Sequence, residues 1–431
     1  MALRLKYDFT KATLAECAVI GPAIVYARAS EARYHNAAGL LVTAASGAAR
    51  IGAHNYSGGL WNNRGFLCEL ASANLFLQSE ALGTSPNAAT TTTVSAFATA
   101  APDGETTADD LLHTGSAGNI IQPITVTNNT VVAVSAYVRQ GTTGAHDWVK
   151  MEWRDASDND NGFEAWFNIA TGAVGTAQAS GTGTLRASTA RIQDLGGWYR
   201  ITCGGQIVSG QTDGELVLTN TTADAVDTAE ETNSVAWWGV QVEEVTIPTS
   251  YMPTGAASTT RAGDSMYLEN SAGELKSAYG FDGAAVGSIV LVTTVGYVRA
   301  NANAQTQFGS NGSNLAYTTG AAGAIQTLDG STTPVLGVTA DHADLVIAHQ
   351  WDNVNAIRSS INGAAVTADT YVGNWNSDNE DQQFAAQGAG AKELNGFLKS
   401  VHYYDTQLSD ALLIAPFTPT SNGSLPLLGA G

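Results

Sequence analysis

The strongest candidate for ligand chemistry is a predicted hairpin over residues 148–169. Side chains alternate in direction along a strand, so Val149, Met151 and Trp153 share one face. The partner strand adds Phe163, Ala165, Phe167 and Ile169 to this apolar face, which we expect to form the core. The opposite face carries two indole rings among charged and amide groups: Trp148, Lys150, Glu152, Glu164, Trp166 and Asn168.

A solvent-facing surface of this composition is typical of sugar binding. An indole plane packs against the C–H face of a sugar ring, and polar side chains bind its hydroxyl groups. We therefore predict these six residues as a glycan-binding site. The alternative is that this face packs against another subunit or against the N-terminal segment.

Two acidic loops are weak candidates for calcium binding. No other cofactor is suggested by the sequence. The turn of the hairpin contains Asp155, Asp158 and Asp160, and a later loop contains Asp378 and Asp381. The first loop does not match the EF-hand, because Asn168 stands where the bidentate Glu is required. A solvated turn is therefore the favoured interpretation of these aspartates.

Motifs for catalysis are absent from the sequence. Glu243 and Glu244 are adjacent, so strand alternation points them to opposite faces and prevents the converging carboxylate pair of glycoside hydrolysis. His342 and His349 have no GxSxG, HExxH or Cys/His pattern near them. We predict that the chain is not an enzyme, although the sequence leaves a distant carboxylate pair open.

Composition favours a multidomain all-β protein. The chain has 431 residues, of which 44% are hydrophobic and 13% charged, with 46 Gly, and it is rich in Thr, Ser, Asn and Ala. This mix suits short strands and tight turns, and the length suits several cores. The formal charge of −20 disfavours nucleic acids and anionic membranes as partners. No apolar run approaches the roughly 18 residues of a membrane span.

The elements that must position these residues fall into two predicted β-sandwiches. Residues 61–265 contain alternating segments at 131–138, 148–153, 163–169, 198–203, 215–218 and 235–242, which indicate a jelly roll. Residues 266–420 contain a second set at 288–295, 306–308, 345–351, 356–361, 371–375 and 397–404. Residues 1–60 hold too little apolar material for a core and are predicted to be an anchoring or docking segment. Residues 421–431 are predicted to be a tail.

Short phrases in a fixed order connect the first 265 residues to a known class of proteins. They are Ala27-Arg28-Ala29-Ser30, Asn36-Ala37-Ala38-Gly39-Leu40, Arg64-Gly65-Phe66-Leu67-Cys68-Glu69, Asn74-Leu75-Phe76-Leu77-Gln78-Ser79-Glu80, Ala101-Pro102-Asp103-Gly104, Thr107-Ala108-Asp109, Gly197-Trp198-Tyr199-Arg200, Thr249-Ser250-Tyr251-Met252-Pro253-Thr254 and Thr260-Arg261-Ala262-Gly263-Asp264. The set resembles phage tail-fibre, head-fibre and minor structural proteins that carry a carbohydrate-binding-module-like jelly roll. The chain departs from them at Cys68 and Gly263, where an aliphatic residue and Ala are commoner.

The C-terminal half carries a second resemblance. Residues 394–413 combine an Asn-Gly turn, an aromatic-rich strand and a short Ser-capped helix, and Ile361-Asn362-Gly363-Ala364-Ala365-Val366 precedes them. These segments resemble concanavalin-like (laminin-G-like) lectin domains. The expected fold class is therefore all-β, with a jelly-roll β-sandwich followed by a concanavalin-like lectin β-sandwich.

Together the resemblances imply a non-enzymatic structural protein on the outer surface of a phage particle. It would serve as a fibre, spike or decoration element, contact other virion proteins, assemble as a homotrimer and bind host surface glycans. Two alternatives are a capsid cement protein without glycan binding and a tail-spike depolymerase. Neither nucleic-acid binding nor membrane insertion is expected.

Overall fold

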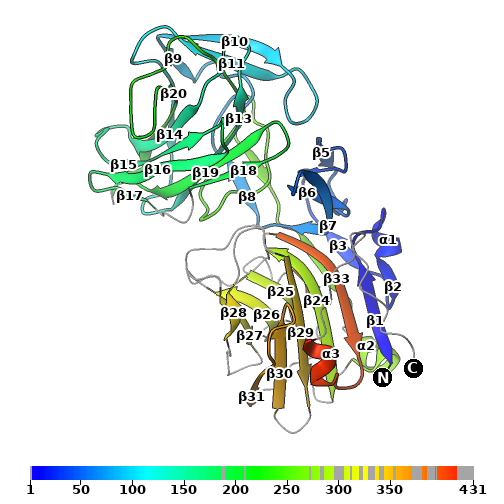
Figure 1. Ribbon diagram of the computed structural model, residues 1–431. Helices are drawn as coiled ribbons and strands as arrows, with labels where there is room; N and C mark the ends of the chain where they lie inside the picture. Colours follow the sequence, from blue (N-terminus) through cyan, green and yellow to red (C-terminus); the bar gives the residue numbers. More distant parts are fainter. Residues whose placement is uncertain are drawn as a thin grey trace.

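The computed structural model describes residues 2–185, 190–207, 210–270, 273–281, 286–295, 305–310, 313–319, 324–328, 335–338, 344–352, 356–370, 381–385, 394 and 396–414. Strands dominate it, and the helices of the described part are short: α1 (Leu14–Cys17), α2 (Glu274–Tyr279) and α3 (Asp410–Ile414). Figure 1 shows two lobes, each built from β-sheets. The prediction of an all-β fold is confirmed. No helix among the described residues is both long and apolar enough to cross a bilayer.

The upper lobe in Figure 1 is the jelly-roll lobe, made of two facing antiparallel sheets. One sheet has the order β10 (Thr92–Thr99), β11 (Ala108–His113), β21 (Val235–Glu243), β13 (Val132–Gln140), β19 (Tyr199–Gln206) and β17 (Thr184–Leu185), with β18 (Arg191–Asp194) also paired to β19. The other has the order β16 (Ala173–Ser180), β15 (Gly162–Asn168), β14 (Trp148–Asp155), β20 (Asp213–Thr221), β12 (Asn119–Thr125) and β9 (Ala88–Thr90).

The core of this lobe confirms the face assigned to the hairpin. Val149, Met151 and Trp153 are fully buried between the sheets, together with Phe163 and Phe167 of the neighbouring strand. Strands β14 and β15 pair in the register that puts these side chains on one face. The other face of the hairpin is therefore the outer face of its sheet.

Strand β21 departs from simple alternation, which predicts Trp238 in one core with Val240 and Val242. Gly239 has a φ of 61°, and the pairing of β21 with β13 shifts register next to it. Such a bulge turns the following side chains to the other face. Trp237 therefore lies in the main core with Val240, whereas Trp238 packs in a second cluster with Tyr137 and Tyr251.

The lower lobe is a second sandwich, here called the lectin-like lobe. Its larger sheet has the order β2 (Ala18–Ile20), β1 (Leu3–Asp8), β33 (Gly396–Tyr404), β24 (Gly287–Val295), β29 (Asp344–Trp351), β30 (Ala356–Ile361) and β31 (Thr367–Thr370), with β7 (Leu60–Cys68) paired to β33 and β6 (Ala53–Ser57) paired to β7. The facing sheet has the order β28 (Val335–Val338), β27 (Ala324–Leu328), β26 (Ser313–Thr319), β25 (Gln305–Ser310), β32 (Gln382–Phe384), β23 (Ser265–Leu268) and β3 (Val25–Ala27). Two small ribbons pair β4 (Ala32–His35) with β5 (Leu41–Ala44), and β8 (Ser72–Asn74) with β22 (Thr259–Arg261).

The N-terminal residues belong to this second sandwich, which corrects the expected separate segment 1–60. Leu5 of β1 pairs with Tyr403 of β33, and Leu5, Tyr7 and Phe9 are buried in the same core as Trp351. The physical reason is that these residues, too few for a core of their own, complete a sheet whose central strands β24, β29 and β33 begin only at Gly287. The predicted strand at 371–375, His342 and the tail 421–431 lie outside the described residues.

The boundaries of the jelly-roll lobe change accordingly. The chain leaves the lectin-like lobe after β7, forms β8 at Ser72–Asn74, and returns through β22 at Thr259–Arg261 into β23. The expected limits at 61 and 265 therefore cut through β7 and into the start of β23. The jelly-roll lobe is an insertion in the lectin-like lobe, joined to it by two antiparallel connections.

Candidate functional site

The outer face of the β14–β15 hairpin holds the six predicted site residues as cross-strand neighbours. Trp148 lies opposite Asn168, and Lys150 lies opposite Trp166. Glu152 lies opposite Glu164. The sequence therefore placed all six on one face, but their exposure differs from the prediction.

Trp166 is not a stacking surface for a sugar, which corrects that part of the predicted site. Its side chain is only 1% exposed, and its indole N–H donates to the backbone carbonyl of Val226 at 3.0 Å. The loop after β20, residues 222–228, thus covers the ring. Removing the large apolar surface of an indole ring from water is favourable, and here a loop of the same lobe covers that surface.

Trp148 and Asn168 have local structural roles at the other end of the hairpin. Trp148 is half-buried, and a side-chain Cβ added at Gly175 would lie 2.5 Å from its ring. The Oδ1 atom of Asn168 accepts from the backbone N–H groups of Ala170 and Thr171, at 3.1 and 2.8 Å. Neither residue lines the groove that lies on this face.

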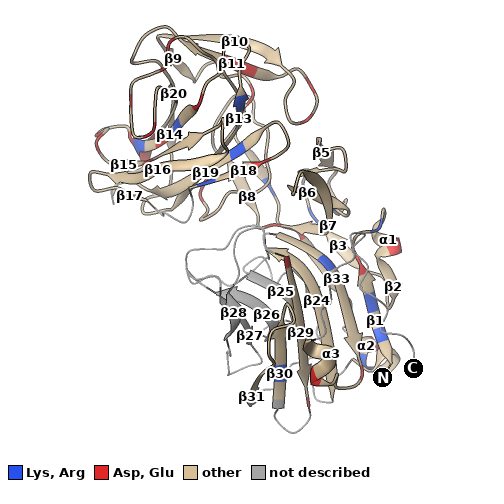
Figure 2. Ribbon diagram, in the orientation of Figure 1, with Lys and Arg blue, Asp and Glu red and all other residues tan. Residues whose placement is uncertain are grey.

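Lys150, Glu152 and Glu164 line a groove of about 590 Å³ on this face. The described residues that join them include Asn119, Arg154, Asp160, Thr219 and Asp227. Figure 2 shows the basic and acidic positions of β14 close together on the jelly-roll lobe. The volume lies within the range of about 300–1,000 Å³ that is usual for small-molecule sites.

An ion network fixes the floor of the groove. The Lys150 Nζ atom lies 2.9 Å from Glu152 Oε2, 3.2 Å from Glu164 Oε2 and 2.7 Å from Asp227 Oδ1. It also lies 5.4 Å from the centre of the Trp166 ring. Burial alone would lower the pKa of Lys150, but the surrounding carboxylates outweigh it and raise that pKa. Lys150 therefore stays charged and holds three carboxylates in place.

The walls of the groove present hydrogen-bond acceptors. Asn119 donates its side-chain N–H to the carbonyl of Ala117 at 3.2 Å, which leaves its Oδ1 atom buried and without a partner among the described residues. Asp160 lies on the rim, and its carboxylate makes no hydrogen bond or ion pair that involves the described residues. Buried acceptors of this kind are usually satisfied by protein or by bound molecules.

Sequence reasoning missed Asn119 and Asp227 as site residues. Asn119 reaches the groove because β12 pairs with β20, and β20 pairs with β14. Asp227 comes from the loop that covers Trp166. The strand pairings that bring Asn119 to the groove leave no local signal in the sequence. For Asp227, the acidic stretch at 224–231 indicates a polar loop but not its position over Trp166.

Of the weak calcium candidates among the described residues, all but Asp160 accept hydrogen bonds from the protein. Asp155 is buried, and its Oδ1 atom accepts from the N–H and the hydroxyl of Ser157 at 2.8 and 2.7 Å. Asp158 accepts from Asn161, and Asp381 accepts from the backbone of Asn270 at 2.9 Å. Asp378 lies outside the described residues. Within the described part of the chain, no three His, Cys, Asp or Glu side chains form a group suited to a metal ion.

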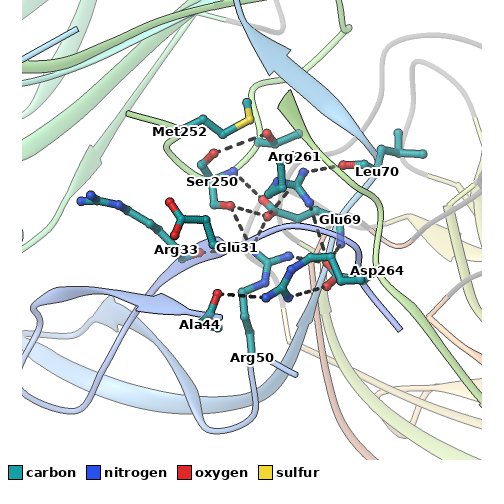
Figure 3. Close-up of polar contacts among 12 residues, drawn as sticks. Glu31, Arg33, Ala44, Arg50, Glu69, Leu70, Ser250, Met252, Arg261 and Asp264 are labelled. Atoms are coloured by element: carbon teal, nitrogen blue, oxygen red, sulfur yellow. Dashed lines mark hydrogen bonds and ion pairs between the residues drawn. The ribbon is translucent and has the colours of Figure 1, made fainter. Parts of the chain in front are cut away.

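A buried ionic cluster joins the two lobes (Figure 3), and we call it the junction cluster. It consists of Arg28, Arg50, Glu69, Ser250, Arg261 and Asp264. Arg50 is fully buried, lies 2.5 Å from Glu69 and pairs with Asp264 as well. Ser250, on the segment that leaves the jelly-roll lobe, donates its N–H and its hydroxyl to Glu69 at 2.6 Å each.

The pair of Arg50 and Glu69 at the centre of the junction cluster is held in its ionised form. Burial would raise the pKa of Glu69, but the charges of Arg50 and Arg261 and a hydrogen bond from Ser250 outweigh it and lower that pKa to about 2. At Arg50, burial is outweighed by Asp264 and Glu69, which raise the pKa. All members except Arg50 lie in the phrases that resemble phage proteins. We interpret those phrases as the sequence requirements of the joint between the lobes.

A smaller pocket lies between the lobes, lined in part by His35, His54, Asn55 and Phe397. Its volume is about 90 Å³, well below the roughly 300 Å³ of a typical ligand site. Gln193 donates to Asn55 at 2.8 Å across it. Burial lowers the pKa of His35 to about 4, so that ring is neutral at pH 7. We assign this pocket to lobe packing.

Comparison with known proteins gives no family for the chain. No protein-family model matches, and no curated protein matches. The CBM40 of the Ruminococcus gnavus IT-sialidase bound to α2,3-sialyllactose is 18% identical over 31% of this chain and 83% of its own, with a TM-score of 0.24.

Two further solved structures are similar to a comparable degree. The CBM22-1 xylan-binding domain from Paenibacillus barcinonensis Xyn10C is 14% identical over 41% of this chain and 94% of its own, with a TM-score of 0.24. Trypanosoma rangeli sialidase is 9% identical over 75% of this chain and 62% of its own, with a TM-score of 0.28. At these values the likeness carries no argument about what the chain does.

Proposed function

We propose that this chain binds glycans through the groove on the jelly-roll lobe, as a non-enzymatic structural protein on the outer surface of a phage particle. The observation that carries the binding part is the groove itself. It is large enough for sugar rings, its charged floor is fixed by the Lys150 network, and Asp160 and Asp227 line it with exposed carboxylates. Polar groups held in fixed positions are what orients a polyhydroxylated ligand.

The arrangement of carboxylates supports binding rather than hydrolysis. Glycoside hydrolysis needs one carboxyl group as an acid and a second, about 5–9 Å away, as nucleophile or base. Glu152 and Glu164 instead share the Lys150 ammonium group, and Gln178 also donates to Glu164 at 2.9 Å. Burial raises the pKa of Glu243, but that side chain is fully enclosed and accepts from Thr249. It is therefore out of reach of a polysaccharide.

The phage assignment is supported by the resemblance of the ordered phrases and by where they lie. Arg28, Glu69, Ser250 and Asp264 come from four of them and meet in one cluster. Other virion proteins and a homotrimeric assembly remain the partners we propose. A decoration protein without glycan affinity is the competing assignment, and the first experiment below separates the two.

The binding test uses a glycan array with the protein displayed in several copies, because single protein–glycan contacts are weak and gain strength from multivalency. We expect at least one glycan class to bind, and Asn119→Ala to lose that binding. Asn62→Ala is the matched control, because Asn62 also donates its amide N–H to local backbone carbonyls, at 3.0 Å, but lies on the lectin-like lobe. If no glycan binds the displayed protein, the binding proposal fails and the decoration role is favoured.

Two further measurements address the remaining parts of the proposal. Incubation with host polysaccharide should release no reducing ends, and their release would identify a depolymerase instead. Immunogold labelling with an antibody against this chain should mark the outside of intact phage particles. Labelling only after the particles are broken would contradict an outer-surface location.

A further inference from the structure

The groove on the jelly-roll lobe has an excess of negative charge. The charged side chains that line it are Lys150, Arg154, Glu152, Asp160, Glu164 and Asp227. Two are basic and four are acidic, which leaves an excess of two negative charges within the groove. Building on the proposed glycan binding, we infer that the groove prefers glycans without acidic groups and disfavours sialylated, uronic and sulfated sugars.

Both basic groups are already paired with protein carboxylates, so much of their charge is neutralised before any ligand binds. The Lys150 Nζ atom contacts three carboxylates, and its side chain is only 5% exposed. The Nε atom of Arg154 lies 2.6 Å from Glu215, and its Nη1 atom lies 3.5 Å from Glu152. A ligand carboxylate that displaced Glu152 or Glu164 from Lys150 would leave a largely buried protein carboxylate without this partner.

The unpaired polar atoms of the groove are acceptors. The accessible one is the carboxylate of Asp160 on the rim, which has no partner among the described residues. Asp227 is paired with Lys150 through one oxygen, yet its side chain is 75% exposed and can accept further bonds. Acceptors require donors, and the hydroxyl groups of a neutral sugar supply them. A carboxylate or a sulfate has none to offer.

The size of the expected discrimination follows from Coulomb's law. A ligand charge about 7 Å from two excess negative charges in a water-like dielectric is disfavoured by a factor of about ten. The effect is screened by salt, because the Debye length falls from about 10 Å at 0.1 M to about 3 Å at 1 M. The preference for neutral glycans should therefore shrink as salt is added, while the affinity for the neutral glycan stays nearly constant.

The test uses matched pairs of oligosaccharides on an array and by calorimetry. Each pair is a neutral oligosaccharide and the same oligosaccharide carrying one sialic or glucuronic acid. We expect the neutral member to bind about tenfold more tightly at low salt. Asp160→Asn should reduce this preference about threefold by removing one of the two excess charges. Asp160 is exposed, and its carboxylate has no partner among the described residues, so the variant should fold normally.

Asp147→Asn is the control for net charge. Asp147 is exposed at the opposite end of the hairpin and does not line the groove, and the substitution changes the total charge by the same amount. It should leave the preference unchanged. An acidic member that binds as tightly as its neutral partner, or a control that acts as strongly as Asp160→Asn, would overturn the inference. Binding of neither member would instead refute the proposed glycan binding itself.

Discussion

Replacing Arg50 by Met should destabilise the lectin-like lobe strongly. Arg50 is fully buried at the centre of the junction cluster and pairs with Glu69 and Asp264. The substitution keeps most of the side-chain volume but leaves two buried carboxylates with fewer cations. Removal of one partner from a buried ion pair costs about 3–5 kcal/mol. Because Arg28 still lies 3.1 Å from Asp264, we expect about 3 kcal/mol, at the lower end of that range.

Arg4→Met is the matched control for this variant. Arg4 also forms one close ion pair, 2.6 Å from Asp405, but its side chain is 49% exposed. Exposed pairs contribute roughly 0–1 kcal/mol, because water screens them and both side chains lose entropy. The two variants remove the same residue type, so the difference between them measures the effect of burial together with that of the second carboxylate partner of Arg50.

Urea unfolding at pH 7, followed by circular dichroism and by tryptophan fluorescence, measures both variants. The two lobes are separate cores, so their transitions need to be fitted separately. If Arg50→Met fails to fold, Arg50→Lys tests the same point with the charge retained and the forked geometry lost. A loss below 1 kcal/mol for Arg50→Met, equal to that of Arg4→Met, would refute the role of the junction cluster.

Further predictions concern close backbone contacts and pH. Gly65→Ala should disrupt the pairing of β7 with β33, because a Cβ at this position would lie 2.3 Å from the carbonyl oxygen of Leu398. Gly59→Ala is the control, because Gly59 has a similar positive φ but open space around it. Gly59→Ala should lower the free energy of unfolding in urea by only about 1 kcal/mol. Burial, and then the nearby His146, lower the pKa of His113 to about 4, so the unfolded chain binds more protons than the folded one between about pH 6.5 and 4. Stability should therefore fall as the pH drops through this window, by up to about 3 kcal/mol from His113. Burial also lowers the pKa values of His35, His349 and His402 to about 4, so His113→Gln should make that part of the pH profile less steep without removing it. An unchanged profile would contradict the contribution of His113.

Local sequence patterns were sufficient for the β14–β15 hairpin. Side-chain alternation separated Met151 from Lys150, and the structure places them in the core and in the groove. Composition was sufficient for the all-β class, because short strands and turns have residue preferences that act within a few positions.

Features that depend on distant partners could not be predicted. Strand alternation predicts that Trp166 is exposed, but in the structure the loop at 222–228 covers it. The pairing of β1 with β33 joins residues about 400 positions apart, and no local pattern in Leu3–Asp8 indicates its partner. The bulge at Gly239 could have been predicted in part, since a glycine within a strand pattern often indicates a β-bulge.

The groove remains a candidate binding site although Trp166 is buried, because its polar residues come from several elements. Lys150 and Glu164 were found from the hairpin, whereas Asn119 required the sheet order β14, β20, β12. The assignment therefore rests on acceptors and charge rather than on stacking. The expected ligand changes accordingly. Instead of a sugar that stacks on an indole ring, we expect a neutral sugar whose hydroxyl groups donate hydrogen bonds.

A crystal structure of the protein soaked with the neutral oligosaccharide that binds best on the array tests the central claim most directly. The account predicts density in the groove, with a sugar hydroxyl within hydrogen-bond distance of the carboxylate of Asp160 or Asp227 and no displacement of Lys150 from its carboxylates. Density only between the two lobes, or on the lectin-like lobe, would contradict it.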